Sequence, residues 1–180
     1  MKTALVLFAR GSEELEAITI VNILRRGAVS VTLAGLEAGV LRGSRNTQIM
    51  PDTTLEEALA HDYDMLVLPG GQPGTHNFKA DTRVIDLIQK MAARGRYVCA
   101  ICAAPSVLAA AGLLDGKRAT GYPGTLDGYA AVQQQASAVV EDGRIITSRG
   151  PGTAMDFALT LLERLAGSAK RAEVEAGLVR

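Results

Sequence analysis

The stretch Arg96-Tyr97-Val98-Cys99-Ala100-Ile101-Cys102-Ala103-Ala104-Pro105 decides the fold expected for this chain of 180 residues. Residues 96–101 form a short apolar run typical of a buried strand, and residues 103–111 have a helical pattern. The chain therefore changes from strand to helix at Cys102, which resembles a nucleophile elbow. Backbone N–H groups at a helix N-terminus favour a thiolate, which predicts a reactive sulfur. The alternative is a small buried core residue, the usual role of a free cysteine.

Short apolar runs alternate with helical patterns on both sides of this corner. Residues 3–8 and 65–68 are continuous apolar strands, typical of a sheet that helices cover on both faces. The alternation predicts one α/β domain over residues 1–180, a three-layer sandwich with a mostly parallel sheet. Ser12 is expected as the N-cap of the first helix. The remaining expectations are strands at 29–34, 118–120, 138–140 and 145–147, a hairpin-like excursion at 39–47, and helices at 13–26, 82–94, 151–165 and 169–178.

Composition excludes several classes of function. The 19 basic and 19 acidic residues balance and form no basic run, which argues against nucleic-acid and membrane-surface partners. The two cysteines, Cys99 and Cys102, have the spacing of a redox pair. Cys99 falls inside the expected strand, however, and its burial there argues against a redox pair. The first residues lead directly into a strand without a signal-peptide pattern, and no apolar run reaches membrane-spanning length. A cytoplasmic, reduced protein is expected.

A glycine-rich segment is expected beside Cys102 at the carboxyl edge of the sheet, where ligands bind in such folds. This segment, Leu68-Pro69-Gly70-Gly71-Gln72-Pro73-Gly74, leaves a buried strand. Its glycines let a backbone N–H approach a substrate oxygen closely, so it would supply half of an oxyanion hole. The N–H of Ala103 would supply the other half. An ordinary tight turn is the alternative.

The start of the first helix, Gly11-Ser12-Glu13-Glu14-Leu15-Glu16, is the third segment expected at this edge. Glu13 and Glu14 are expected as solvated charges that the helix dipole favours. Glu16 shares a stripe with apolar residues one and two turns further on, which predicts burial and a raised carboxyl pKa. A protonated Glu16 would donate a hydrogen bond to Cys102 or relay its proton. A surface position for Glu16 stays open, since most of this helix is apolar.

The chain resembles the ThiJ/PfpI superfamily along its whole length. Within it, the likeness is closest to the branch of the animal parkinsonism-associated deglycase and its bacterial YajL-type relatives. This resemblance implies a flavodoxin-like fold, a homodimer built around the first helix, and chemistry without a metal or an organic cofactor. Four segments in this order carry it: Gly11-Ser12-Glu13-Glu14-Leu15-Glu16, Val67-Leu68-Pro69-Gly70-Gly71, Ala100-Ile101-Cys102-Ala103-Ala104-Pro105 and Ile146-Thr147-Ser148-Arg149-Gly150-Pro151-Gly152-Thr153.

The resemblance also implies roles for individual residues. Cys102 corresponds to an oxidisable nucleophile and Glu16 to its protonated partner. Gly71 and Ala103 correspond to the backbone donors at the site, and Gly70 belongs to the same lining loop.

Two arginines and one tyrosine complete the implied set. Arg45 and Arg26 correspond to arginines near the subunit contact, with Arg45 also lining the site. Tyr122 stands where much of the family has histidine, as it does in YajL-type members, and this removes the obvious general base. His76 follows the glycine-rich segment and is the histidine with a route to the site; His61 is expected on the surface.

The resemblance implies addition of the Cys102 thiolate to small dicarbonyls, and Glu16 would move protons during isomerisation to a hydroxy acid. The expected activity is that of a glyoxalase independent of glutathione, or of a deglycase of protein and nucleotide adducts, with a role in carbonyl and oxidative stress. Ala103 replaces the histidine of the peptidase branch, which argues against a cysteine protease. The alternatives are a redox sensor or redox-regulated chaperone through a Cys102 sulfinate, and a dimeric binding module.

Overall fold

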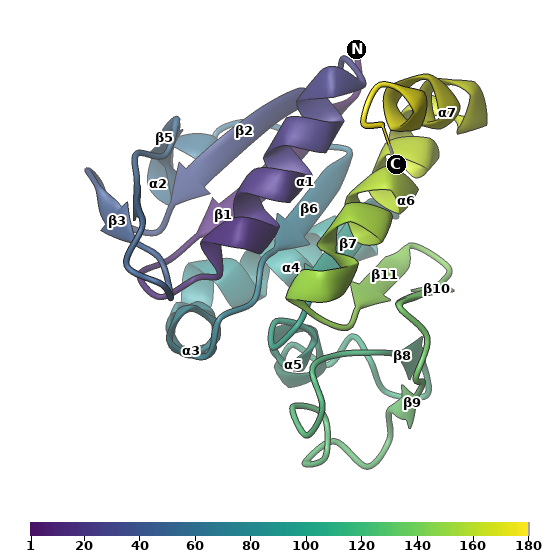
Figure 1. The fold of residues 1–180 in the computed structure, drawn as a ribbon. Coiled ribbons are helices and arrows are strands. Elements are labelled where there is room, and N and C mark those ends of the chain that lie inside the picture. The colour runs from purple at the N-terminus through teal and green to yellow at the C-terminus, as the bar shows by residue number, and fades with distance from the viewer. Residues whose placement is uncertain (180) are drawn as a thin grey trace.

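The computed structural model describes residues 1–179, and a seven-stranded sheet lies at its centre (Figure 1). The strand order is β10-β11-β7-β6-β1-β2-β5, and every neighbouring pair is parallel except β10 with β11. This confirms the expected α/β fold with a mostly parallel sheet. The strands are β1 (Thr3–Phe8), β2 (Ser30–Gly35), β5 (Thr53–Thr54), β6 (Met65–Leu68), β7 (Tyr97–Ile101), β10 (Val139–Asp142) and β11 (Ile145–Ser148).

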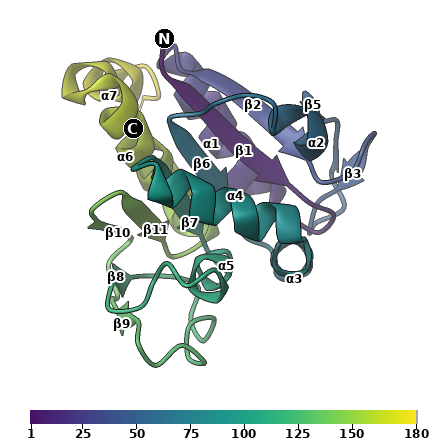
Figure 2. The same ribbon diagram turned by 180° about the vertical axis from the view of Figure 1, so that it is seen from behind.

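Helices cover both faces of this sheet. One face packs against α1 (Glu14–Arg26) and α6 (Ala154–Ala166), and α7 (Ser168–Ala176) lies against α6. Figure 2 shows the opposite face, which carries α2 (Leu55–Ala58), α3 (Gln72–Ala80), α4 (Thr82–Ala93) and α5 (Pro105–Ala110). Successive β1 side chains alternate between the two cores, so every position from Ala4 to Phe8 is buried. This is why the strand is a continuous apolar run.

Two small two-stranded sheets, one antiparallel and one parallel, lie outside the central sheet. In the first, β3 (Leu41–Arg42) pairs antiparallel with β4 (Gln48–Ile49), as the hairpin-like excursion predicts. In the second, β8 (Arg118–Ala119) pairs parallel with β9 (Gln133–Gln134). The expected helix over residues 151–165 begins as a 3-10 turn, η1 (Pro151–Thr153), before α6.

Two local predictions are wrong. The N-cap of α1 is Glu13, whose carboxylate accepts the Leu15 N–H at 3.4 Å. Ser12 is instead fully buried, and its hydroxyl accepts the Ala9 N–H at 3.0 Å, which closes the turn after β1. The glycine-rich segment is also shorter than expected, because α3 begins at Gln72 directly after Gly71.

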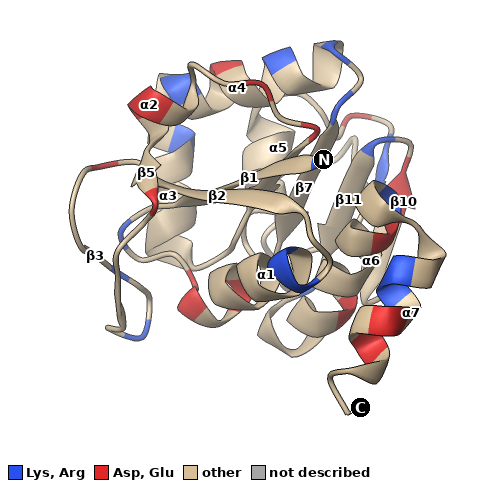
Figure 3. Cartoon of the chain, turned by 90° about the horizontal axis from the view of Figure 1, so that it is seen from above, with Lys and Arg blue, Asp and Glu red and all other residues tan. Residues whose placement is uncertain are grey.

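Charged residues lie mainly on the helices and loops, and β1 and β7 carry none (Figure 3). The last helix, α7, is held to α6 by an ion pair between Arg171 and Glu163 at 2.7 Å and by the buried side chain of Val174. Within residues 1–179, no helix has the length and apolar character needed to cross a membrane.

Candidate functional site

The corner at Cys102 has a backbone conformation that is uncommon for a residue other than glycine, with φ at +64°. Two neighbouring segments hold it there. The Cys102 N–H donates to the Ser148 carbonyl at 3.0 Å, and the Cys102 carbonyl accepts the Tyr122 N–H at 2.7 Å. Because both backbone groups are fixed, the left-handed conformation persists, as strained residues do at functional sites. The Cys102 side chain is left 8% exposed at the end of β7.

The Glu16 carboxyl lies beside this sulfur and is fully buried, as its helical stripe predicts. Its Oε2 accepts the Gly70 N–H at 2.7 Å. A Cβ at Gly70 would lie 2.5 Å from Cys102 Cβ and 2.9 Å from Glu16 Oε2, so only glycine leaves room for the two groups to meet. The other oxygen, Oε1, has no hydrogen-bond partner among residues 1–179.

Two backbone N–H groups, from Gly71 and Ala103, form hydrogen bonds toward the Cys102 sulfur. Gly71 has φ at +86°, and a Cβ there would lie 2.3 Å from the Gly11 carbonyl oxygen. Glycine is therefore required for both the left-handed conformation and the close packing. Both N–H groups therefore face the thiol.

Burial controls the protonation of this pair. Burial raises the pKa of Glu16 to about 7, although the Gly70 N–H and the Cys102 thiol act to lower it. Burial and the Glu16 charge raise the pKa of Cys102 to about 12, and the N–H groups of Gly71 and Ala103 offset this only in part. The helix N-terminus does not lower the thiol pKa as expected, since α5 has only 6 residues and the sulfur is desolvated. At neutral pH the Cys102 thiol therefore keeps its proton, and the Glu16 carboxyl is close to the midpoint of its titration.

A cavity of about 390 Å³ opens onto Cys102. Of the predicted site residues, Cys102, Gly71, Ala103, Tyr122 and Arg45 line it, whereas Glu16 and Gly70 are buried outside its lining. Sequence reasoning did not name the other lining residues as site residues, although all but Ser44 lie in the segments quoted above. These residues are Glu13, Ser44, Gln72, Pro73 and Pro151.

Glu13 and Glu14 are not solvated, contrary to expectation, and each is only 8% exposed. The turn between β3 and β4 covers them. Glu13 Oε2 accepts the Ser44 hydroxyl at 2.7 Å, and the Glu14 carboxylate accepts the N–H groups of Arg45 at 3.0 Å and Thr47 at 3.2 Å. Both carboxylates thus join the start of α1 to the turn that borders the cavity.

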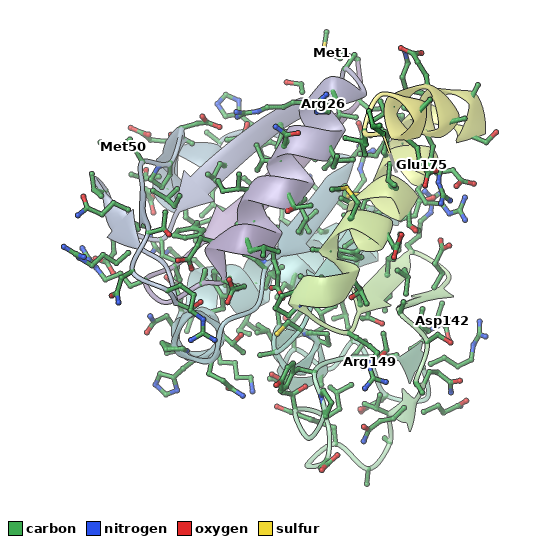
Figure 4. The ribbon with its side chains drawn as sticks, viewed as in Figure 1. Met1, Arg26, Met50, Asp142, Arg149 and Glu175 are labelled. Carbon is green, nitrogen blue, oxygen red and sulfur yellow. The ribbon has the colours of Figure 1, made fainter. Side chains whose placement is uncertain are left out.

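The structure does not bring every candidate to this cavity. Arg26 lies at the far end of α1, where its guanidinium donates to Asn22 at 2.8 Å (Figure 4). His76 is exposed on α3 outside the lining. Cys99 is fully buried in the core, and both cysteines are free thiols. No three His, Cys, Asp or Glu side chains of residues 1–179 are grouped closely enough to hold a metal ion.

A mostly parallel sheet with helices on both faces, and a cysteine at a strand-to-helix corner, define a flavodoxin-like α/β protein with a nucleophile elbow. The model of the DJ-1/PfpI family matches residues 2–164. The chain belongs to the DJ-1/PfpI family, as its sequence motifs predict.

Relatives in this family match nearly the whole chain. Protein dj-1beta of Drosophila melanogaster is 44% identical over 183 residues, which cover 99% of this chain and 97% of that protein. Its crystal structure superposes with a TM-score of 0.96 at 43% identity, covering 99% of this chain and 97% of that one. The Parkinson disease protein 7 homolog of Danio rerio is 39% identical, with 99% and 97% covered. The glutathione-independent glyoxalase DJR-1.2 of Caenorhabditis elegans is 33% identical, with 94% and 91% covered.

Proposed function

We propose that this protein is a cysteine-dependent glyoxalase that works without glutathione, a metal or an organic cofactor. Its substrates would be methylglyoxal, glyoxal, or their early adducts with proteins and nucleotides, in protection against carbonyl and oxidative stress. One observation carries the proposal: Cys102, Gly71 and Ala103 line one cavity, and the buried Glu16 carboxyl lies beside the Cys102 sulfur. The similarity to the glyoxalase of Caenorhabditis elegans supports the reaction class.

In the first step the Cys102 sulfur forms a bond to the aldehyde carbon, and the carbonyl electron pair moves to the oxygen. The N–H groups of Gly71 and Ala103 bind the oxygen as its charge develops. The thiol proton passes to Glu16, whose pKa of about 7 suits a general base at neutral pH. Glu16 then returns this proton to the oxygen, which gives a hemithioacetal.

In the second step Glu16 removes the proton from the carbon bonded to sulfur, and an enediolate forms. Return of a proton to the neighbouring carbon gives a thioester of a 2-hydroxy acid. Water then cleaves the carbon–sulfur bond, releases the acid and restores the thiol. One carbon is oxidised while its neighbour is reduced, so the electrons balance within the substrate.

Loss of methylglyoxal and formation of lactate, measured without glutathione, test the proposal. Wild-type protein should convert methylglyoxal, and Cys102→Ala and Glu16→Gln should not. Cys99→Ala is the matched control, because that thiol is fully buried away from the cavity, and it should retain activity. A wild-type protein as inert as Cys102→Ala would rule out the enzyme.

Oxidation of Cys102 offers a second function, as a redox sensor or a redox-regulated chaperone. The geometry favours it because the N–H groups of Gly71 and Ala103 would hold the oxygens of a sulfinate beside Glu16. Two equivalents of peroxide would add two oxygens to the sulfur and leave two waters. Intact mass after mild peroxide should gain two oxygens at Cys102. Oxidation that begins at Cys99 would argue against this function.

A homodimer built around α1 is also proposed, with Arg26 at the subunit contact. In support, α1 leaves two large apolar side chains in solvent, with Leu15 51% and Ile18 42% exposed. Light scattering should give twice the mass of the chain for wild type, and Ile18→Glu should shift it toward the monomer. A wild-type monomer would refute the dimer.

The family branch, the cellular location and the number of domains complete the proposal. Tyr122 at the histidine position supports the bacterial YajL-type branch, and the same branch suggests a cytoplasmic location. A single domain is supported by the sheet itself, because its strands come from residues 3 to 148. Limited proteolysis should then leave one resistant core rather than two separable fragments.

A further inference from the structure

The turn between β3 and β4, residues 43–47, is folded around the carboxylate of Glu14. This carboxylate accepts the Arg45 N–H at 3.0 and 3.1 Å, the Thr47 N–H at 3.2 Å and the Ser44 hydroxyl at 3.3 Å. The Glu14 side chain is 8% exposed. Successive backbone N–H groups that converge on one anion form a nest, a geometry that proteins use to bind anions. Here the anion is a side chain of the same chain.

The rest of the turn is shaped to receive this carboxylate. A Cβ at Gly43 would lie 2.3 Å from Glu14 Oε2, so any larger residue would displace the carboxylate. The Gly43 N–H donates to the Thr47 carbonyl at 2.9 Å, which closes the turn. The Ser44 N–H donates to the Ser12 carbonyl at 2.8 Å and ties the turn to the start of α1.

Arg45 lies in this turn and lines the cavity above Cys102. Its side chain is exposed, and within residues 1–179 its guanidinium has no carboxylate partner. No ion pair therefore fixes the cation. Its place at the cavity depends on the backbone of the turn, which Glu14 holds through the Arg45 N–H.

We propose that Glu14 is a positioning residue that holds the 43–47 turn so that Arg45 faces the cavity and attracts negative charge toward Cys102. The charge would be that of an anionic carbonyl compound or of the enediolate and hydroxy acid formed from it. The inference deepens the proposed function and rests on it only for the identity of that anion.

The ionisation of Glu14 agrees with this role. Burial acts to raise its pKa, but hydrogen bonds from the N–H groups of Glu14 itself, Arg45 and Thr47 hold the pKa below its usual value. The anion that organises the turn is thus present throughout the neutral range.

Alkylation of Cys102 tests the inference without any dicarbonyl turnover. Iodoacetate is an anion and iodoacetamide is neutral, and both react with the same thiolate, so the ratio of their rates cancels changes in thiol pKa. A cation near the sulfur should favour iodoacetate by about fivefold at low salt. Arg45→Gln should abolish this preference, and Glu14→Gln should reduce it to the same level. The double variant should show no further loss.

A second variant, Gly43→Ala, displaces the carboxylate without changing Glu14 and should give the same loss. Hydrogen exchange of the backbone amides of residues 44–47 should also accelerate in Glu14→Gln and in Gly43→Ala. The matched controls are Glu37→Gln, an exposed carboxylate, and Gly128→Ala, where a Cβ meets no atom within 4 Å. Both should keep the wild-type ratio.

Two results would overturn the inference. Either Arg45→Gln keeps the preference for iodoacetate, or Glu14→Gln and Gly43→Ala keep it while Arg45→Gln loses it. If methylglyoxal is not consumed but the ratios behave as expected, the proposed function fails and the positioning role of Glu14 stands.

Discussion

The stability of this protein should fall as pH rises from 4.5 to about 7, and Glu16 should cause the fall. Burial raises the pKa of Glu16 from 4.5 to about 7 in the folded protein, so folding favours the protonated carboxyl. The stabilisation is complete below the unfolded pKa and is lost as pH rises to the folded pKa. At about 1.4 kcal/mol for each tenfold change, the loss is at most about 3 kcal/mol.

Urea unfolding of wild type and Glu16→Gln at about pH 4 and about pH 8 measures this term. Glutamine has nearly the same shape and does not titrate, so the free energy of unfolding of wild type should fall by up to about 3 kcal/mol more than that of the variant. Carboxyls with lowered pKa values, such as Glu14, titrate in both proteins and cancel in the comparison. Equal pH dependence of the two proteins would refute the reasoning. Glu173→Gln, an exposed carboxylate, should follow wild type.

Three further substitutions test the packing around the site by urea and thermal unfolding. Gly70→Ala should cost about 1–3 kcal/mol and stop reaction at the thiol, because its Cβ would lie 2.5 Å from Cys102 Cβ. Ser12→Ala should cost about 1–3 kcal/mol, since the buried Ala9 N–H loses its acceptor. Phe157→Ala should cost about 3–5 kcal/mol, because this side chain is fully buried between α6 and the sheet.

Each of these has an outcome that would contradict it. Gly128→Ala is the control for Gly70→Ala and should stay within about 0.5 kcal/mol of wild type. A Gly70→Ala protein that alkylates Cys102 as fast as wild type would mean that the Glu16 contact is not needed for reactivity. If Ser12→Ala keeps full stability, water replaces the hydroxyl as acceptor. A small effect at Phe157 would mean that α6 collapses onto the space left behind.

The central sheet was predictable because each of its buried strands has a local signature. Residues 4–8 and 65–68 are apolar at every position, and that pattern is typical of a sheet covered on both faces. The periodicity of the first helix placed Glu16 in the core for the same reason. The short strand β5 and helix α2 were not predicted, because segments of 2 and 4 residues have no measurable period.

The surroundings of the site depended on contacts between distant residues. Glu13 and Glu14 are expected in solvent from their place at a helix start, yet Arg45, in the turn that buries Glu14, lies 31 residues away. The separation of Arg26 from the cavity is likewise a consequence of the length of α1. Arg45 lies beside the start of this helix, and Arg26 is at its end.

By itself, the sequence determined the α/β architecture, the corner at Cys102 and the burial of Glu16, because these depend on local polarity and spacing. The tertiary structure decided the chemistry of the pair. Desolvation by distant segments, together with the nearby Glu16 charge, raises the thiol pKa to about 12, where the helix start alone would lower it. Burial is a property of the whole packed molecule, so no local pattern around Cys102 could supply it.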